Sequence, residues 1–166
     1  IYKQLINNHL LYNAFNVVFY FVLLRLLRNQ QKRSMPKKIT GLASWLLIVF
    51  GVVNAMFIQG PDRLQTLTIV VGGGLCILAS GLYFWQLYQS EANDRLSRDP
   101  WFWFSFGLIV YFGGTVPFLG MLNYLYDNFR HFTTIYFNYF MTIFTVFLNV
   151  MITVGYLRAQ PSVDKG

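Results

Sequence analysis

The sequence contains unusually little charge. Only 11% of its 166 residues are Asp, Glu, Lys or Arg, against about 25% in an average soluble domain. Hydrophobic residues make up 55% of the chain and aromatic residues 19%. This composition excludes an ordinary water-soluble fold. The formal net charge is +7, but the sequence has no solvated basic domain of the kind that binds phosphates, so we expect no nucleic-acid partner.

Residues that carry chemistry are also scarce. The single cysteine, Cys76, lies within an apolar run, which excludes a disulfide framework and a cysteine metal site. The two histidines, His9 and His131, lie at the ends of apolar stretches, where neither predicts zinc or haem ligation. Asp, Glu and Lys are absent from the middle of these stretches, which disfavours proton-coupled or ion-coupled transport. We therefore expect no metal, no cofactor and no enzymatic activity.

Five long, nearly uncharged stretches dominate what remains. They cover residues 10–27, 39–58, 66–88, 101–124 and 132–157. A helix of about 20 residues, with a rise of roughly 1.5 Å per residue, crosses a hydrocarbon core of about 30 Å. Membrane-spanning strands need only about 10 residues each. The pattern predicts one all-α domain over residues 1–166, a polytopic transmembrane helix bundle. Because the chain starts at Ile1 without a signal-peptide pattern, we expect further residues upstream.

Basic residues are concentrated in the connector between the first two stretches. They are Arg28, Lys32, Arg33, Lys37 and Lys38. If this connector is cytoplasmic, threading the chain puts ten basic residues on that side and three, Lys3, Arg63 and Arg130, on the other. The positive-inside rule then predicts an N-outside, C-inside orientation. We expect the bacterial inner membrane. Attraction of the connector to anionic lipid headgroups is a compatible alternative.

Polar residues follow one face of the first and the last stretch. At spacings of three or four, the first stretch has Asn13, Asn16 and Tyr20, and the last has Asn138, Thr142, Thr145 and Asn149. Asn54 lies at a similar depth to the first group. Such faces turn inward in a membrane. One hypothesis is a polar pocket open to the outside; the alternative is interhelical hydrogen bonding, at about 0.6 kcal/mol per contact.

Glycine, proline and aspartate mark the third and fourth stretches. Gly74 and Gly81, and Gly107 and Gly114, are each seven residues apart, which predicts close packing of the two helices. Pro117 predicts a kink, either a hinge or a static bend. Asp99 followed by a proline predicts the capped start of the fourth helix.

Several segments carry a resemblance to a known family. They are residues 83–88 at the end of the third stretch, 98–103 and 108–115 in the fourth, and 154–157 in the last. This carboxyl-terminal part resembles an uncharacterised family of seven-helix integral membrane proteins of Bacteroidota-type bacteria, some of which are found near signalling kinases. The resemblance implies that the five stretches are the last five of seven, in a sensory or accessory membrane module.

Three functions remain open. The connectors are too short to hold a catalytic or recognition domain, so any output must pass through a partner. We favour a non-enzymatic interaction module, an accessory subunit of a larger complex, in contact with lipids and a membrane protein partner. The alternative is a sensor that uses the outward polar pocket. A transporter ranks third because the sequence has no convincing internal repeat.

Overall fold

The fold is a bundle of helices, seen here in a computed structural model that describes residues 2–61, 63–89 and 99–158. The helices are α1 (Tyr2–Gln30), α2 (Ser34–Val53), the short π-helix η1 (Asn54–Ile58), α3 (Thr66–Tyr88), α4 (Pro100–Gly120), α5 (Leu122–Asn128) and α6 (Arg130–Arg158). Five of them, counting α2 and η1 as one, are long and apolar enough to cross a membrane. This confirms the predicted all-α polytopic bundle.

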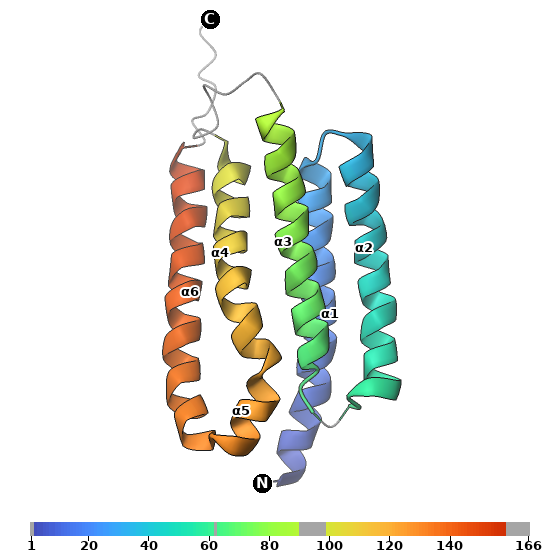
Figure 1. The fold of residues 1–166 in the computed structure, drawn as a ribbon, viewed down its shortest axis with the longest axis vertical. Coiled ribbons are helices and arrows are strands. Elements are labelled where there is room, and N and C mark those ends of the chain that lie inside the picture. Colours follow the sequence, from blue (N-terminus) through green and yellow to red (C-terminus); the bar gives the residue numbers. More distant parts are fainter. Residues whose placement is uncertain (1, 62, 90–98, 159–166) are drawn as a thin grey trace, which may run out of the picture.

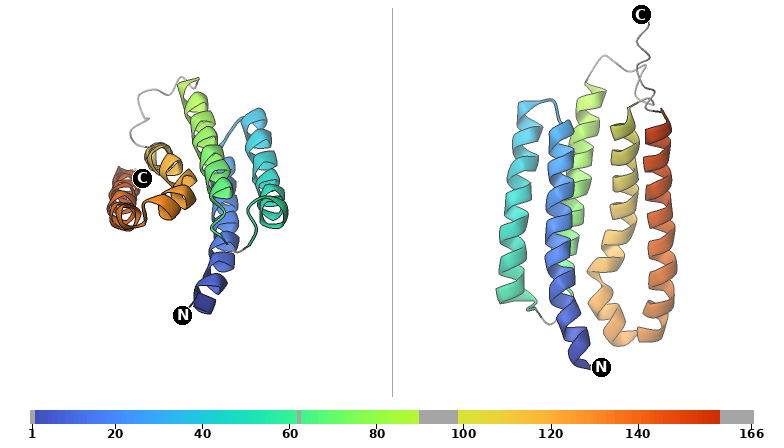
Figure 2. Two further views of the ribbon diagram at one scale, coloured as in Figure 1. Left: turned by 60° about the horizontal axis from the view of Figure 1, so that its bottom comes forward. Right: turned by 180° about the vertical axis from the view of Figure 1, so that it is seen from behind.

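The helices lie nearly parallel, as Figure 1 shows. The helix α3 packs against α1, α2 and α4, and α6 packs against α4 on the side away from α3. From behind and from the end, the same arrangement is visible (Figure 2). The connector between α1 and α2 and the end of α6 lie at one end of the bundle, and the start of α1 lies at the other.

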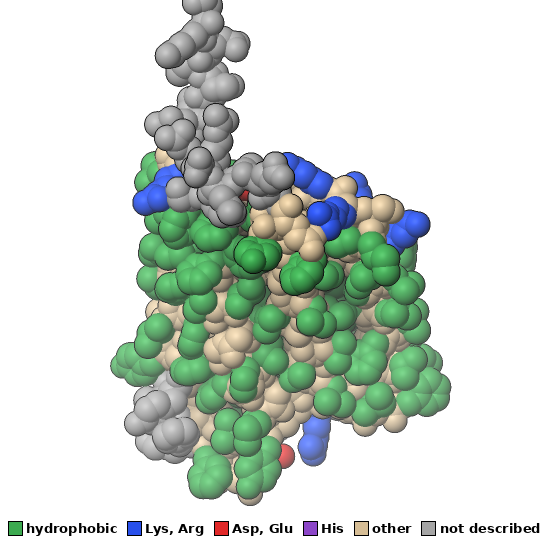
Figure 3. Space-filling view, turned by 45° about the horizontal axis from the view of Figure 1, so that its top comes forward, with side chains coloured by type: hydrophobic (Ala, Val, Ile, Leu, Met, Phe, Trp, Pro, Cys, Tyr) green, Lys and Arg blue, Asp and Glu red, His purple; other side chains and the backbone are tan. Residues whose placement is uncertain are grey.

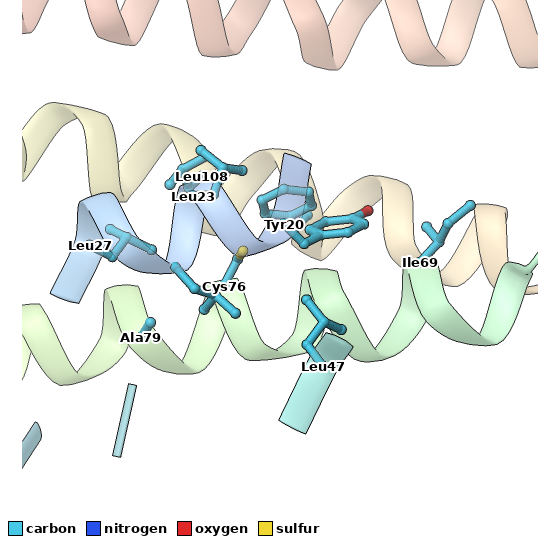
Figure 4. Packing of buried hydrophobic residues seen from close by; sticks show 10 residues of the cluster. Tyr20, Leu23, Leu27, Leu47, Ile69, Cys76, Ala79 and Leu108 are labelled. Atoms are coloured by element: carbon cyan, nitrogen blue, oxygen red, sulfur yellow. The ribbon is translucent and has the colours of Figure 1, made fainter. Parts of the chain in front are cut away.

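The core gathers where α1, α2, α3 and α4 meet. Figure 4 shows Tyr20 and Leu27 of α1, Leu47 of α2, Cys76 of α3 and Leu108 of α4 converging there. The ring of Tyr20 also contacts that of Phe112, with centroids 5.6 Å apart. The helix α6 contributes no fully buried apolar side chain to this cluster among the described residues. The bundle is therefore closely packed around α3 and open around α6.

The start of α4 is where the sequence predicts it, but its end is not. The carboxylate of Asp99 accepts the backbone N–H of Trp101 at 2.9 Å, so the predicted cap of α4 is confirmed. The fourth stretch was expected to continue to residue 124, but α4 ends at Gly120 and α5 begins at Leu122. Pro117 has no N–H to donate, and its ring disfavours a regular turn. Figure 1 shows α4 bent in the half that leads to α5.

The closest approach of α3 and α4 involves other glycines than expected. A Cβ on Gly73 would lie 2.3 Å from Val116 of α4, whereas Gly74 and Gly81 have open space beside them. Gly107 and Gly114 face α6 instead. At Gly114, an added Cβ would lie 2.1 Å from the ring of Phe144. A spacing of seven shows which residues share a face, but it does not show which neighbour that face meets.

Two adjacent glycines of α3 provide a test of this packing. A Cβ on Gly72 would lie 2.5 Å from the ring of Tyr20, so Gly72→Ala should destabilise the bundle by about 1–3 kcal/mol through overpacking. Gly74→Ala meets open space and should be neutral or stabilising by up to about 1 kcal/mol. Unfolding of both variants in a denaturing-detergent titration, followed by circular dichroism, measures the difference. Equal effects would contradict the close contact at Gly72.

Candidate functional site

Buried amide and hydroxyl groups form a network at the end of the bundle opposite the basic connector. The amide of Asn54, which is fully buried, donates to Gln59 Oε1 at 3.0 Å and to Thr68 Oγ1 at 2.9 Å. Gln59 Nε2 in turn donates to Thr66 Oγ1 at 2.9 Å. The wide π-helical turn, closed by Gln59 N–H and the Asn54 carbonyl at 3.0 Å, places these side chains on the same side.

Asn13 joins α1 to the segment that precedes α3. Its Nδ2 donates to the carbonyl of Arg63 at 2.9 Å, and its Oδ1 accepts the backbone N–H of Gln65 at 2.9 Å. Asn123 of α5 binds the same segment, because its Nδ2 donates to the carbonyl of Leu64 at 3.1 Å. Both ends of the Asn13 amide are thus occupied by backbone groups. This arrangement fits the alternative of interhelical hydrogen bonding at Asn13.

The other residues of this predicted group have different surroundings. Tyr20 is buried in the core, and Asn16 is only half-buried. The Oδ1 atom of Asn54 is buried and has no hydrogen-bond partner among the described residues. Asn13 and Asn54 lie at the same end of the bundle, as expected. Their amide N–H groups donate to protein atoms, which leaves those groups unavailable to a ligand.

The predicted polar residues of α6 lie on the outside of the bundle. Asn138, Thr142 and Asn149 are all exposed. The opposite side of α6 meets α4, where Phe144 packs over Gly114. Hydrogen bonds of these polar side chains run along α6 itself: Thr142 Oγ1 donates to the Asn138 carbonyl at 2.6 Å, and Asn149 Nδ2 to the Thr145 carbonyl at 2.9 Å.

The structure thus separates the two groups that were expected to line one pocket. Hydrogen bonds of Asn13 and Asn54 connect α1 and the end of α2 to the start of α3. The polar residues of α6 face outward from a helix that packs against α4 and α5. Helical periodicity predicted that the polar residues of each stretch share a face, and those of α6 are all exposed. The relative positions of α1 and α6 depend on tertiary packing, which one helix pattern does not encode.

The basic connector forms the charged end of the molecule. Figure 3 shows Lys and Arg along this end, next to a broad hydrophobic surface. Arg158, at the end of α6, places its guanidinium 5.1 Å from the ring of Trp103 at the same end. Arg63 is exposed at the opposite end. Three basic residues of the predicted cytoplasmic side, Arg95, Arg98 and Lys165, lie outside the described residues.

A buried glutamine that no sequence motif marks holds this connector in place. Gln86 of α3 is buried, and its Oε1 accepts the backbone N–H groups of Lys32 at 2.8 Å and Arg33 at 3.0 Å. Gln31 Nε2 adds a bond to the carbonyl of Ala79 at 3.3 Å. Gln65, whose Oε1 accepts from Thr68 Oγ1 at 3.3 Å, was not predicted either. The sequence signal common to Gln86 and Gln65 is an amide side chain near the edge of an apolar stretch.

The known proteins offer no guide to these arrangements. No protein-family model, curated protein or solved structure matches the chain. The resemblance to the seven-helix family therefore stays an expectation from the sequence. Within the described ranges, no three His, Cys, Asp or Glu side chains come together as metal ligands would.

Asn13 and Asn16 form a matched pair for testing the network. Asn13→Leu leaves the N–H of Gln65 without its acceptor, so it should lower the free energy of unfolding by about 1 kcal/mol or more. Asn16→Leu, one turn further along α1, should change it by less than about 0.5 kcal/mol. The same detergent-unfolding titration measures both. An Asn13 variant as stable as the wild type would show that the network contributes no stability.

Proposed function

We propose that this chain is a non-enzymatic interaction module, an accessory subunit of a larger membrane complex, and that α6 is the helix that docks to its partner. The observation that carries the proposal is the position of Asn149. Its side chain is exposed, and it lies near the middle of the membrane-spanning part of α6, Phe137–Arg158. Only 6% of the apolar stretch of this segment is buried inside the bundle, whereas 44% of the corresponding stretch of α3 is buried.

An exposed amide at this depth is costly when only lipid surrounds it. The Asn side chain has two N–H donors and one carbonyl acceptor, and the bond to Thr145 uses one donor. The second donor and the acceptor would face hydrocarbon, where no water can replace the missing partners. A neighbouring helix that offers polar groups at the same depth relieves this cost. The partner is therefore a protein rather than the lipid alone.

The spacing of the stripe indicates what kind of helix docks there. Asn138, Thr142, Thr145 and Asn149 follow one another at intervals of four, three and four residues, the alternation found along the seam between two helices. Asn and Thr are small enough to allow close approach and can hydrogen bond across the interface. We infer a single transmembrane helix of the partner, with small and hydrogen-bonding residues along one face.

The sensor alternative has less support. It requires amide groups that can reach a ligand. Both ends of the Asn13 amide and the donors of Asn54 bind protein atoms, and the Oδ1 of Asn54, which has no partner among the described residues, is buried. The cluster of basic residues at the α1–α2 end supports a cytoplasmic position for that end by the positive-inside rule. With it, we infer an N-outside, C-inside orientation in the bacterial inner membrane.

Substitution of Asn149 tests the proposal. Asn149→Leu should release a co-purifying membrane protein that the wild type retains at fixed stoichiometry in mild detergent, because it removes the polar contact at mid-membrane. Asn149→Gln keeps the amide and should retain the partner, as should Val150→Leu, an apolar change on the exposed neighbour. Intact-complex mass spectrometry measures the release.

Several outcomes would contradict the subunit proposal. They are a wild-type monomer under mild conditions, a dimer of this chain alone, and a partner that stays bound to the Asn149→Leu variant. Circular dichroism should show an unchanged helix content for this variant, because residue 149 is exposed and leucine is compatible with lipid.

A further inference from the structure

A cavity of about 300 Å³ opens at the basic end of the bundle. Its walls come from the α1–α2 connector, the end of α3 and the start of α4. The lining residues that carry the argument are Lys32, Arg33, Tyr83, Gln86, Asp99 and Trp101. This volume is at the lower limit of small-ligand sites and suits a headgroup rather than a whole lipid.

The walls are held in place by hydrogen bonds. Gln86 Oε1 accepts both backbone N–H groups of Lys32 and Arg33, which fixes the position of the chain from which the two cationic side chains extend. Across the cavity, the hydroxyl of Tyr83 donates to Asp99 Oδ2 at 2.5 Å. The other oxygen of Asp99 accepts the N–H of Trp101 at 2.9 Å. The cavity is therefore built by three separate elements.

The charge of the cavity favours an anion. Lys32 and Arg33 contribute two positive charges, and Asp99 contributes one negative charge whose two oxygens already accept hydrogen bonds. Arg33 donates from Nη1 to the amide oxygen of Gln89, a neutral partner. Lys32 has no ion pair with any carboxylate in the described part of the chain. Among the described residues, the ammonium of Lys32 and the remaining guanidinium donors of Arg33 therefore have no carboxylate partner, and such donors are those that bind phosphate most strongly.

The depth of the cavity favours a lipid as the source of that anion. Lys32 and Arg33 on its wall belong to the basic end of the bundle, and Trp101, also on its wall, is of the type that gathers at the headgroup level. We propose that this cavity binds the phosphate of an anionic phospholipid headgroup through Lys32 and Arg33. The α6 interface is not required for this binding.

The connector offers a charge-matched control for the test. Lys37 and Lys38, in the first turns of α2, are exposed and lie outside the cavity lining. The purified full chain in detergent is titrated with phosphatidylglycerol, and bound lipid is counted by intact-protein mass spectrometry. The double variant Lys32→Gln/Arg33→Gln should weaken binding of the first lipid by about tenfold. Lys37→Gln/Lys38→Gln, with the same loss of charge, should change it by less than about twofold.

Two further arms make the result decisive. Lys32→Arg keeps the charge and should retain binding, which separates loss of the phosphate contact from a folding defect. Inorganic phosphate at millimolar concentration should not displace the lipid. Equal weakening in both double variants would show general attraction to a basic surface and overturn the proposal. Complete displacement by inorganic phosphate would overturn the assignment to a lipid.

Discussion

The structure depends on one constraint: within hydrocarbon, every backbone N–H and C=O group needs a partner from the protein itself. Regular helices meet this requirement along their length, and five helices of this chain are long enough to do so across a membrane. At the end of a helix, the last backbone N–H and C=O groups have no partner within the helix. Polar side chains of this protein lie at those ends and bind some of these groups. Gln86 binds the N–H groups of the α1–α2 connector, Asn13 the segment before α3, and Asp99 the start of α4.

This constraint also gives meaning to the exposed stripe of α6. Both ends of the Asn13 amide have protein partners, whereas the side chain of Asn149 lies near the middle of a span with one hydrogen bond, to its own helix. The buried side chains of the core around Tyr20 and Cys76 come from α1, α2, α3 and α4, and α6 adds only the partly buried Leu148 among the described residues. An exposed amide near mid-span, with a single side-chain bond along its own helix, is what we expect of a protein that completes its packing in a complex.

The sequence predicted the architecture well because hydrophobic length is a strong signal. Each of the five stretches coincides largely with one long helix, and the cap at Asp99 is where its side chain and the following proline place it. The break after Gly120 was missed because the apolar run continues past it. Pairing between helices was not predictable from one sequence. Gly107 and Gly114 share a face, but only the fold shows that this face meets Phe144 of α6.

The most direct test of the account is the accessibility of its two ends in intact cells. Cysteines replace Lys37, at the basic end, and Arg63, at the opposite end, both of which are exposed; the natural Cys76 is buried and gives no background. An impermeant thiol reagent should modify the cysteine at position 63 in intact cells, and the one at position 37 only after the membrane is opened. Modification at position 37 in intact cells would contradict the proposed threading of the chain through the membrane.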